Sequence, residues 1–108
     1  MQDEQLRQFI LQQLEEMKAK EITIIDVSET SDITDTMIIA TGTSKRHVRS
    51  IAEQTTLAAK RAGEVAIGIE GLEGSEWVLA DFGNVVLHVL QDETRKFYDL
   101  EKLWLQQE

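Results

Sequence analysis

The chain has 108 residues, and its 11 Lys and Arg residues against 20 Asp and Glu residues give a net charge of −9. This length, with 42% hydrophobic and 29% charged residues, predicts one globular domain over residues 1–108 and excludes a disordered chain or a coiled coil. The absence of cysteine excludes disulfides, thiolate metal sites and cysteine nucleophiles, and the acidic start and short apolar runs predict a cytoplasmic protein with no membrane span.

The first half of the chain is predicted to form a helix, two strands and a second helix. Residues 3–18 place apolar side chains three and four positions apart, which is typical of an amphipathic helix. Residues 21–27 and 36–41 are short and rich in β-branched side chains, so they are expected to form strands joined by a polar loop. Apolar residues then recur at helical spacing up to Gly63, where a glycine is expected to end the helix.

The second half is predicted to add three strands and a closing helix. Residues 65–69 are expected to form a strand, and the apolar runs on either side of Gly83-Asn84 predict an antiparallel hairpin. The closing helix is expected to begin at Asp92 and to turn one apolar side toward the core. This apolar side consists of Phe97, Leu100, Leu103 and Trp104.

The predicted order αββαβββα describes a single mixed five-stranded sheet flanked by helices, of the α/β or α+β class. The strand at residues 36–41 leads through a helix to the strand at residues 65–69, which fits a right-handed crossover between parallel strands. This strand, turn and helix also resemble the nucleotidyltransferase fold, whose chemistry requires two nearby carboxylates for magnesium. The pair is missing, because Glu53 is the only acidic residue from Lys45 to Gly63, so we expect a scaffold without catalytic residues.

The charge is distributed unevenly along the chain. Residues 1–35 carry a net charge of −6, residues 36–62 carry +4, and residues 63–108 carry −7. The acidic balance opposes nucleic-acid backbones and suits a basic protein partner, so no direct nucleic-acid recognition is expected. Solubility alone would also explain the charge.

The turn at residues 42–44 is the best local candidate for a small-molecule site. Side chains that carry or can take up a positive charge follow it at Lys45, Arg46, His47 and Arg49. Amides and cations at a helix N-terminus bind anions, whereas Thr43 or Ser44 would alternatively act as a simple helix cap. The turn matches neither the P-loop nor the dinucleotide-binding fingerprint.

The remaining polar residues predict no metal, cofactor or catalytic site. Asp32 and Asp35 have no third ligand or partner histidine nearby in the chain, which is more typical of a turn. His47 and His88 are too few for a histidine-rich zinc site, and His88 is expected to be a sheet residue with a hydrogen-bonded ring nitrogen.

Five of the six aromatic residues lie between residues 77 and 104. Trp77 and Leu79 are expected to share one strand face with Asp81, and Tyr98 lies off the apolar side of its helix, in a stripe with Lys102. Because Trp and Tyr are enriched in binding hot spots, these side chains predict a protein-docking surface. Burial of all five aromatic residues in the core is the alternative.

Three segments resemble a known protein family. They are ITIIDVSETSDITDTMIIATGTSKRHV, then EG with WVLADFGNVVLHV, and RKFYDLEKLW. In their order and spacing, from about residue 6 to residue 104, they are similar to the ribosomal silencing factor RsfS, or Iojap-like, family. The pattern of that family falls on Asp35, Gly42, Ser44, Arg46, His47, Glu70, Gly71, Trp77, Asp81, Gly83, His88, Arg95, Tyr98, Leu100, Glu101, Leu103 and Trp104. The chain departs from it mildly at Met37, Ala80 and Asn84.

The resemblance implies a binding protein and not an enzyme. Members of the family dock on the large ribosomal subunit, on its fourteenth protein, and obstruct joining of the small subunit, which represses translation when nutrients are scarce. The resemblance also implies a nucleotidyltransferase-like sheet without catalytic residues, no cofactor, no membrane association and a possible homodimer.

A steric blocker needs only affinity for one subunit face and enough bulk to exclude the other subunit. We therefore expect Trp77 and Leu79 on the sheet, with Tyr98 and Lys102 on the last helix, to make the docking contacts. Asp81 or Glu101 is expected to face basic ribosomal residues. Two alternatives stay open, namely a docking module for a different protein partner and a nucleotide-binding transferase that uses residues 42–49.

Overall fold

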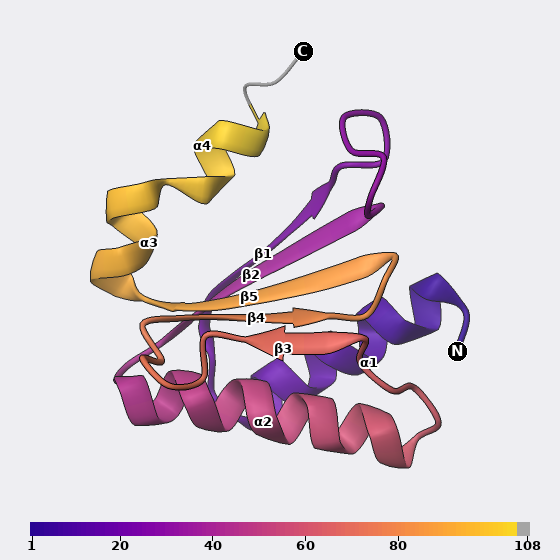
Figure 1. Cartoon of the computed structure of the whole chain (residues 1–108), viewed down its shortest axis with the longest axis horizontal. Helices are drawn as coiled ribbons and strands as arrows, with labels where there is room; N and C mark the ends of the chain where they lie inside the picture. The colour runs from indigo at the N-terminus through magenta and orange to yellow at the C-terminus, as the bar shows by residue number, and fades with distance from the viewer. Residues whose placement is uncertain (106–108) are drawn as a thin grey trace.

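A computed structural model describes the backbone of residues 1–105 and the side chains of residues 1–102. Helices α1 and α2 lie together on one side of a five-stranded sheet, and α3 and α4 lie on its other side, at the end where β5 finishes (Figure 1). The helices are α1 (Asp3–Glu16), α2 (Lys45–Arg61), α3 (Asp92–Tyr98) and α4 (Leu100–Leu105). The strands are β1 (Lys20–Asp26), β2 (Thr36–Gly42), β3 (Gly68–Glu70), β4 (Trp77–Asp81) and β5 (Val85–Gln91).

The sheet has the strand order β1-β2-β5-β4-β3, with β2 and β5 parallel and the other neighbours antiparallel. This confirms the predicted mixed five-stranded sheet and the hairpin of β4 and β5. β3 runs in the direction of β2, as the crossover prediction has it, but β5 and β4 lie between them. The parallel neighbour of β2 is therefore β5. Every residue of β2 and all but the last of β5 are buried, and strands covered on both faces take central positions in a sheet.

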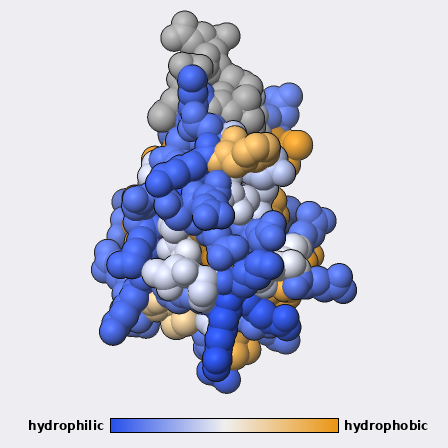
Figure 2. Space-filling view, turned by 90° about the vertical axis from the view of Figure 1, so that its left-hand side faces the viewer, coloured by the Kyte–Doolittle hydropathy of each residue, from blue (hydrophilic) through white to orange (hydrophobic). Residues whose placement is uncertain are grey.

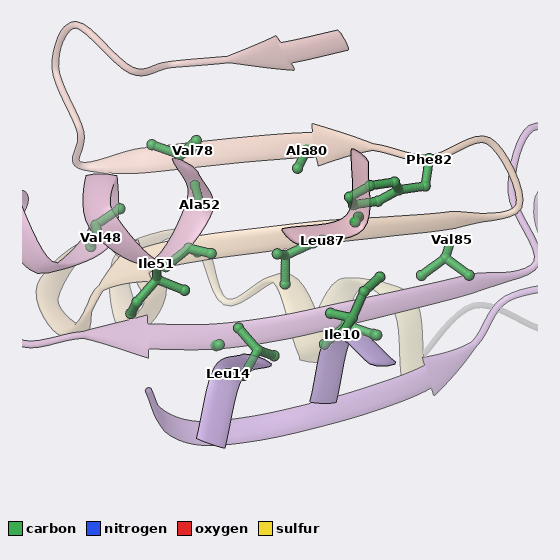
Figure 3. Close-up of a cluster of buried hydrophobic side chains, with 14 of the residues drawn as sticks. Ile10, Leu14, Val48, Ile51, Ala52, Val78, Ala80, Phe82, Val85 and Leu87 are labelled. Atoms are coloured by element: carbon green, nitrogen blue, oxygen red, sulfur yellow. The ribbon is translucent and has the colours of Figure 1, made fainter. Parts of the chain in front are cut away.

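The main core lies between the sheet and the first two helices. Ile10 and Leu14 of α1 are completely buried, as the helical spacing predicts, and they belong to one cluster with Val48 and Ile51 of α2 over the face of the sheet (Figure 3). Sheet residues of the same cluster include Ile38, Ala40, Val78, Ala80, Val85, Leu87 and Val89. Burial of this apolar surface is the main term that stabilises the fold.

The chain reverses direction at residues that the sequence marks clearly. Ser44 caps α2, because its hydroxyl accepts a hydrogen bond from the amide of His47 at 3.0 Å. Gly63 follows the end of α2 with φ = +95°, and Gly83 takes φ = +90° in the β4–β5 turn. Both positions need the left-handed backbone that glycine adopts without strain.

Two predicted elements differ from the structure. The strand expected at residues 65–69 is limited to Gly68–Glu70, and Val65 and Ile67 are exposed instead. The closing helix is divided into α3 and α4 by Asp99, which has φ = +50°. The break interrupts the helical period, so Leu100 is buried as predicted while Phe97, predicted to lie in the core, is 81% exposed. The side chains of Leu103 and Trp104 lie outside the described residues.

Candidate functional site

The second face of the sheet carries the residues that the sequence singles out. Trp77, Leu79 and Asp81 alternate with the buried Val78 and Ala80 along β4, and each is only partly buried. The predicted shared face of these three residues is therefore confirmed. Trp77 packs at the edge of a smaller core made by Ile25, Val27, Met37, Ile39, Leu90 and Leu100.

An aromatic cluster of Trp77, His88, Phe97 and Tyr98 forms where this face meets α3. The ring centroids of Trp77 and Tyr98 are 4.9 Å apart, and those of Phe97 and Tyr98 are 5.0 Å apart in an edge-to-face arrangement. Tyr98 is 54% exposed. The structure thus brings Trp77 and Tyr98 together from elements that are distant in sequence, and it adds Phe97, which the helical period had assigned to the core.

The side of the molecule on which α3 lies is largely hydrophilic, with a compact apolar patch toward the upper end of the view (Figure 2). Exposed aromatic side chains with a polar surround are typical of protein-docking surfaces. Within α3, the exposed large hydrophobic residues are Phe97 and Tyr98. The arrangement can bind a partner by packing.

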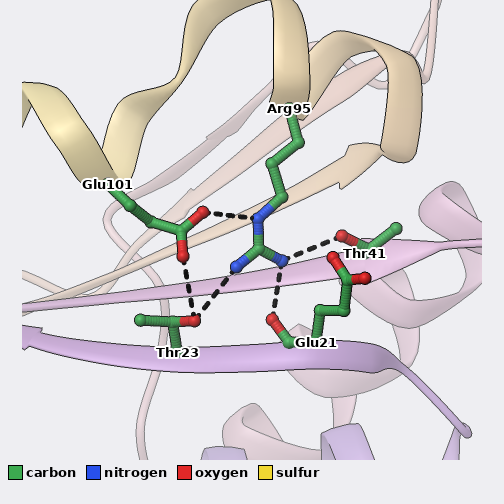
Figure 4. Close-up of polar contacts among 5 residues, drawn as sticks. All are labelled: Glu21, Thr23, Thr41, Arg95 and Glu101. Carbon is green, nitrogen blue, oxygen red and sulfur yellow. Dashed lines mark hydrogen bonds and ion pairs between the residues drawn. The ribbon is translucent and has the colours of Figure 1, made fainter.

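Arg95 fixes α3 and α4 to the sheet. The residue is 5% exposed, and its guanidinium donates hydrogen bonds to the carbonyl of Glu21 at 2.6 Å and to the hydroxyl groups of Thr41 and Thr23 at 2.9 and 3.0 Å (Figure 4). Its Nε donates to Glu101 Oε1 at 2.8 Å. Arg95 thus joins β1, β2, α3 and α4, and it anchors the backbone of the helix that carries Phe97 and Tyr98.

Glu101, which the sequence analysis expects to face a partner, is engaged inside the chain. Besides the ion pair with Arg95, its Oε2 accepts a hydrogen bond from the hydroxyl of Thr23 at 3.1 Å. The hydrogen bond from Arg95, with a smaller contribution from Thr23, holds the pKa of Glu101 below its ordinary value. The sequence shows neither contact, because the Arg95–Glu101 pair spans the helix break at Asp99.

The other expected docking residues have different surroundings. Asp81 Oδ1 accepts a hydrogen bond from the amide of Gly83 at 2.8 Å, which shapes the β4–β5 turn. Leu79 lies opposite His88 of β5 and Glu70 of β3. Lys102 is exposed on α4.

The turn at residues 42–44 uses its polar groups within the fold. Nδ1 of His47 accepts a hydrogen bond from the amide of Thr43 at 2.9 Å, and its Nε2 lies 2.8 Å from the carbonyl of Met17, so this ring ties the turn to the end of α1. A Cβ at Gly42 would lie 2.7 Å from Val48, which makes this glycine a packing requirement. Ser44 serves as the cap, as one of the two sequence alternatives expects.

A surface hollow of about 540 Å³ beside this turn is acidic. Its lining residues are Lys20, Glu21, Thr41, Gly42, Thr43, Gln91, Asp92 and Glu93. Three carboxylates against one ammonium group oppose the binding of a phosphate. The hollow therefore favours the structural explanation of the turn over a nucleotide site.

Asp32 and Asp35 belong to the loop between β1 and β2. Both are exposed, and the backbone of Asp35 pairs with Val27 and Asn84 where β2 begins. Over the residues that the structure describes, no three His, Cys, Asp or Glu side chains are grouped closely enough to hold a metal ion. Within the same residues, no helix is long and apolar enough to cross a bilayer.

Comparison with known proteins decides the family. Residues 1–108 match the family model RsfS, described as "ribosomal silencing factor during starvation". The chain belongs to the RsfS family. This family acts in ribosome-related regulation, and the resemblance seen in the sequence is confirmed.

Relatives of the RsfS family share both sequence and structure with the chain. The ribosomal silencing factor RsfS of Haemophilus influenzae is 39% identical over 99 residues, which cover 92% of this chain and 97% of that protein. A mouse relative named "mitochondrial assembly of ribosomal large subunit protein 1" is 34% identical over 84% of this chain and 41% of its own length. A crystal structure from Chromobacterium violaceum, 38% identical, superposes with a TM-score of 0.95 over 100% of this chain and 90% of that one.

Proposed function

We propose that this RsfS-family chain silences ribosomes by docking on the large subunit, through its fourteenth protein, and sterically excluding the small subunit. In this proposal residues 1–108 act as one cytoplasmic domain without catalytic activity. The observation that carries the proposal is the aromatic cluster, in which Tyr98 and Phe97 are exposed on a surface held by the buried Arg95. The name of the mouse relative, which refers to the large subunit, supports the choice of subunit.

The docking contacts follow from the position of each residue. Tyr98 and Phe97 supply exposed apolar area, while Trp77 supports Tyr98 from beneath and Leu79 extends the same face. Lys102 and Asp81 provide charge at the margin. Glu101 contributes by holding Arg95, and its direct contact with the partner is the less favoured part of the sequence prediction because both carboxylate oxygens are engaged.

Co-sedimentation with isolated ribosomal subunits tests the proposal. The protein should sediment with large subunits and not with small subunits, and subunit joining should fall when it is added before the small subunits. Binding to neither subunit would overturn the proposal and favour a different protein partner. Sedimentation of the free protein is measured in parallel, because a homodimer formed through the aromatic cluster would compete with docking.

Tyr98→Ala should weaken binding to large subunits by more than about 1 kcal/mol, or about fivefold, if Tyr98 is a hot spot. The reason is the loss of an exposed ring packed on Trp77. Ile67→Ala is the matched control, since Ile67 is 75% exposed but lies outside the cluster. Equal binding by both variants, each folded by circular dichroism, would remove Tyr98 from the docking surface.

A further inference from the structure

Trp77 and His88 form a directional contact beneath the docking surface. The indole Nε1 of Trp77 donates a hydrogen bond to Nδ1 of His88 at 3.0 Å, with ring centroids 5.9 Å apart. Trp77 pairs with Leu90 and His88 pairs with Leu79 across β4 and β5, so the two rings are diagonal neighbours on one face. Because an indole nitrogen can only donate, Nδ1 of His88 carries no proton.

The surroundings of His88 keep its ring neutral. His88 is 6% exposed and lies between Ile39 of β2 and Leu79 of β4 in the sheet register. Burial lowers the pKa of His88 to about 4, since the charged imidazolium loses its hydration there. Nδ1 is therefore available as an acceptor near neutral pH.

We propose that His88 is a positioning residue for docking: it fixes the indole of Trp77, and the indole in turn sets the position of the exposed Tyr98. The inference rests on the proposed function, because it concerns the same surface. Trp77 is the contact between the two residues, since it hydrogen-bonds His88 and packs against Tyr98 at 4.9 Å. A docking surface fixed before binding loses less conformational freedom on association.

Arg95 and His88 stabilise different parts of this surface. Arg95 anchors the backbone of α3 and α4 through β1 and β2, whereas His88 acts on the side chain of Trp77. Loss of the His88 acceptor should thus alter docking while α3 stays in place. Substitution of a residue needed only for stability would not weaken docking while leaving the position of α3 unchanged.

His88→Asn and His88→Leu form a matched pair for the test. The two replacements have similar branched shapes, but only asparagine has an oxygen able to accept the indole hydrogen. We expect His88→Leu to bind large subunits about tenfold more weakly than His88→Asn. In a Trp77→Phe background, which has no indole N–H, the two variants should bind equally.

The indole N–H resonance of Trp77 in ¹⁵N-edited NMR gives a readout that does not involve the ribosome. Trp77→Phe assigns the signal, and His88→Leu should move it toward the position of a free indole and speed its exchange, while His88→Asn should retain more of the wild-type shift. An unchanged signal in His88→Leu would overturn the inference. Equal docking by His88→Leu and His88→Asn in a protein that retains Trp77 would also overturn it. If the wild-type protein binds no subunit, the proposed function fails, and the indole signal alone decides whether His88 positions Trp77.

Discussion

At the scale of single residues, Arg95 shows how a surface helix is tied to a small sheet. Its guanidinium donates hydrogen bonds to two hydroxyl groups, one carbonyl and one carboxylate, which belong to β1, β2 and α4. A buried charge of this kind is tolerated because each guanidinium nitrogen donates at least one hydrogen bond and Glu101 supplies the opposite charge. The match of Arg95 and Glu101 to the family pattern therefore has a structural explanation.

Arg95→Met should lower the free energy of unfolding by about 1 to 3 kcal/mol, because it removes the hydrogen bonds that join α3 to β1, β2 and α4 and leaves the partly exposed carboxylate of Glu101 without its ion-pair partner. Urea unfolding at neutral pH measures this change. Lys96→Met is the control, since Lys96 pairs with Asp92 on an exposed part of α3, where water screens the ion pair, and should leave the free energy of unfolding nearly unchanged. Equal effects of the two substitutions would show that the Arg95 network contributes little.

His88 should make the protein less stable as the pH falls from 6.5 toward 4. Its folded pKa of about 4 lies below the ordinary value of 6.5, so the unfolded chain takes up the proton first. The stabilising effect is complete above the ordinary value and is lost as the pH decreases across this interval, by about 3 kcal/mol at most.

Unfolding free energies measured between about pH 7 and about pH 4 check this dependence against His88→Leu, in which the slope should be smaller. Asp26 and Glu101 change the free energy of unfolding at lower pH than His88 does. Hydrogen bonds from Ser28 and Arg95 hold their pKa values below the ordinary 3.8 and 4.5, so their contributions are present above these values and are lost below them. Equal slopes in the wild type and His88→Leu would contradict the assignment to His88.

At the scale of elements, the spacing of apolar residues correctly predicted which side of a single strand or helix is buried. The alternation along residues 77–82 placed Trp77 and Leu79 correctly, and the spacing in α1 identified its buried side. The sequence did not reveal the helix break at Asp99. The hydrogen bonds on either side of the break join Arg95 and Glu101 to β1, which is distant in sequence. Phe97 was assigned to the core for the same reason, and the exposed part of the site was therefore only half predicted.

The loop before β4 is packed tightly against the start of β4. Gly71 has φ = +90°, and a Cβ there would collide with the backbone carbonyl of Trp77. Gly71→Ala should therefore lower stability by more than about 1 kcal/mol and displace the start of β4.

Gly63→Ala separates backbone strain from this collision. Gly63 has φ = +95°, and a Cβ added there would meet no other part of the described chain within 4 Å, so its substitution carries only the conformational cost. Thermal unfolding and large-subunit binding should both change more for Gly71→Ala than for Gly63→Ala. A smaller effect at Gly71 would mean that the loop moves away from Trp77 at little cost.

At the scale of the whole molecule, the acidic charge acts over longer distances than the aromatic contacts. The net charge of −9 arises although residues 36–62 are basic, and Arg46 of α2 is exposed. Glu70 lies opposite Leu79 in the sheet register and is also exposed, so its charge lies on the sheet face that carries Trp77 and Leu79. If this face docks as proposed, its negative charge should draw it toward a basic ribosomal protein.

Glu70→Gln should slow association with large subunits by about two- to fivefold at low salt, and the difference from wild type should shrink as salt screens the charges. Arg46→Gln removes one charge of the opposite sign from a helix on the other side of the sheet, and it should leave the rate unchanged or raise it. Stopped-flow binding at two salt concentrations measures both variants. Slower association of Arg46→Gln with unchanged association of Glu70→Gln would indicate that α2 meets ribosomal RNA, because phosphate contacts require the cation and gain nothing from the carboxylate.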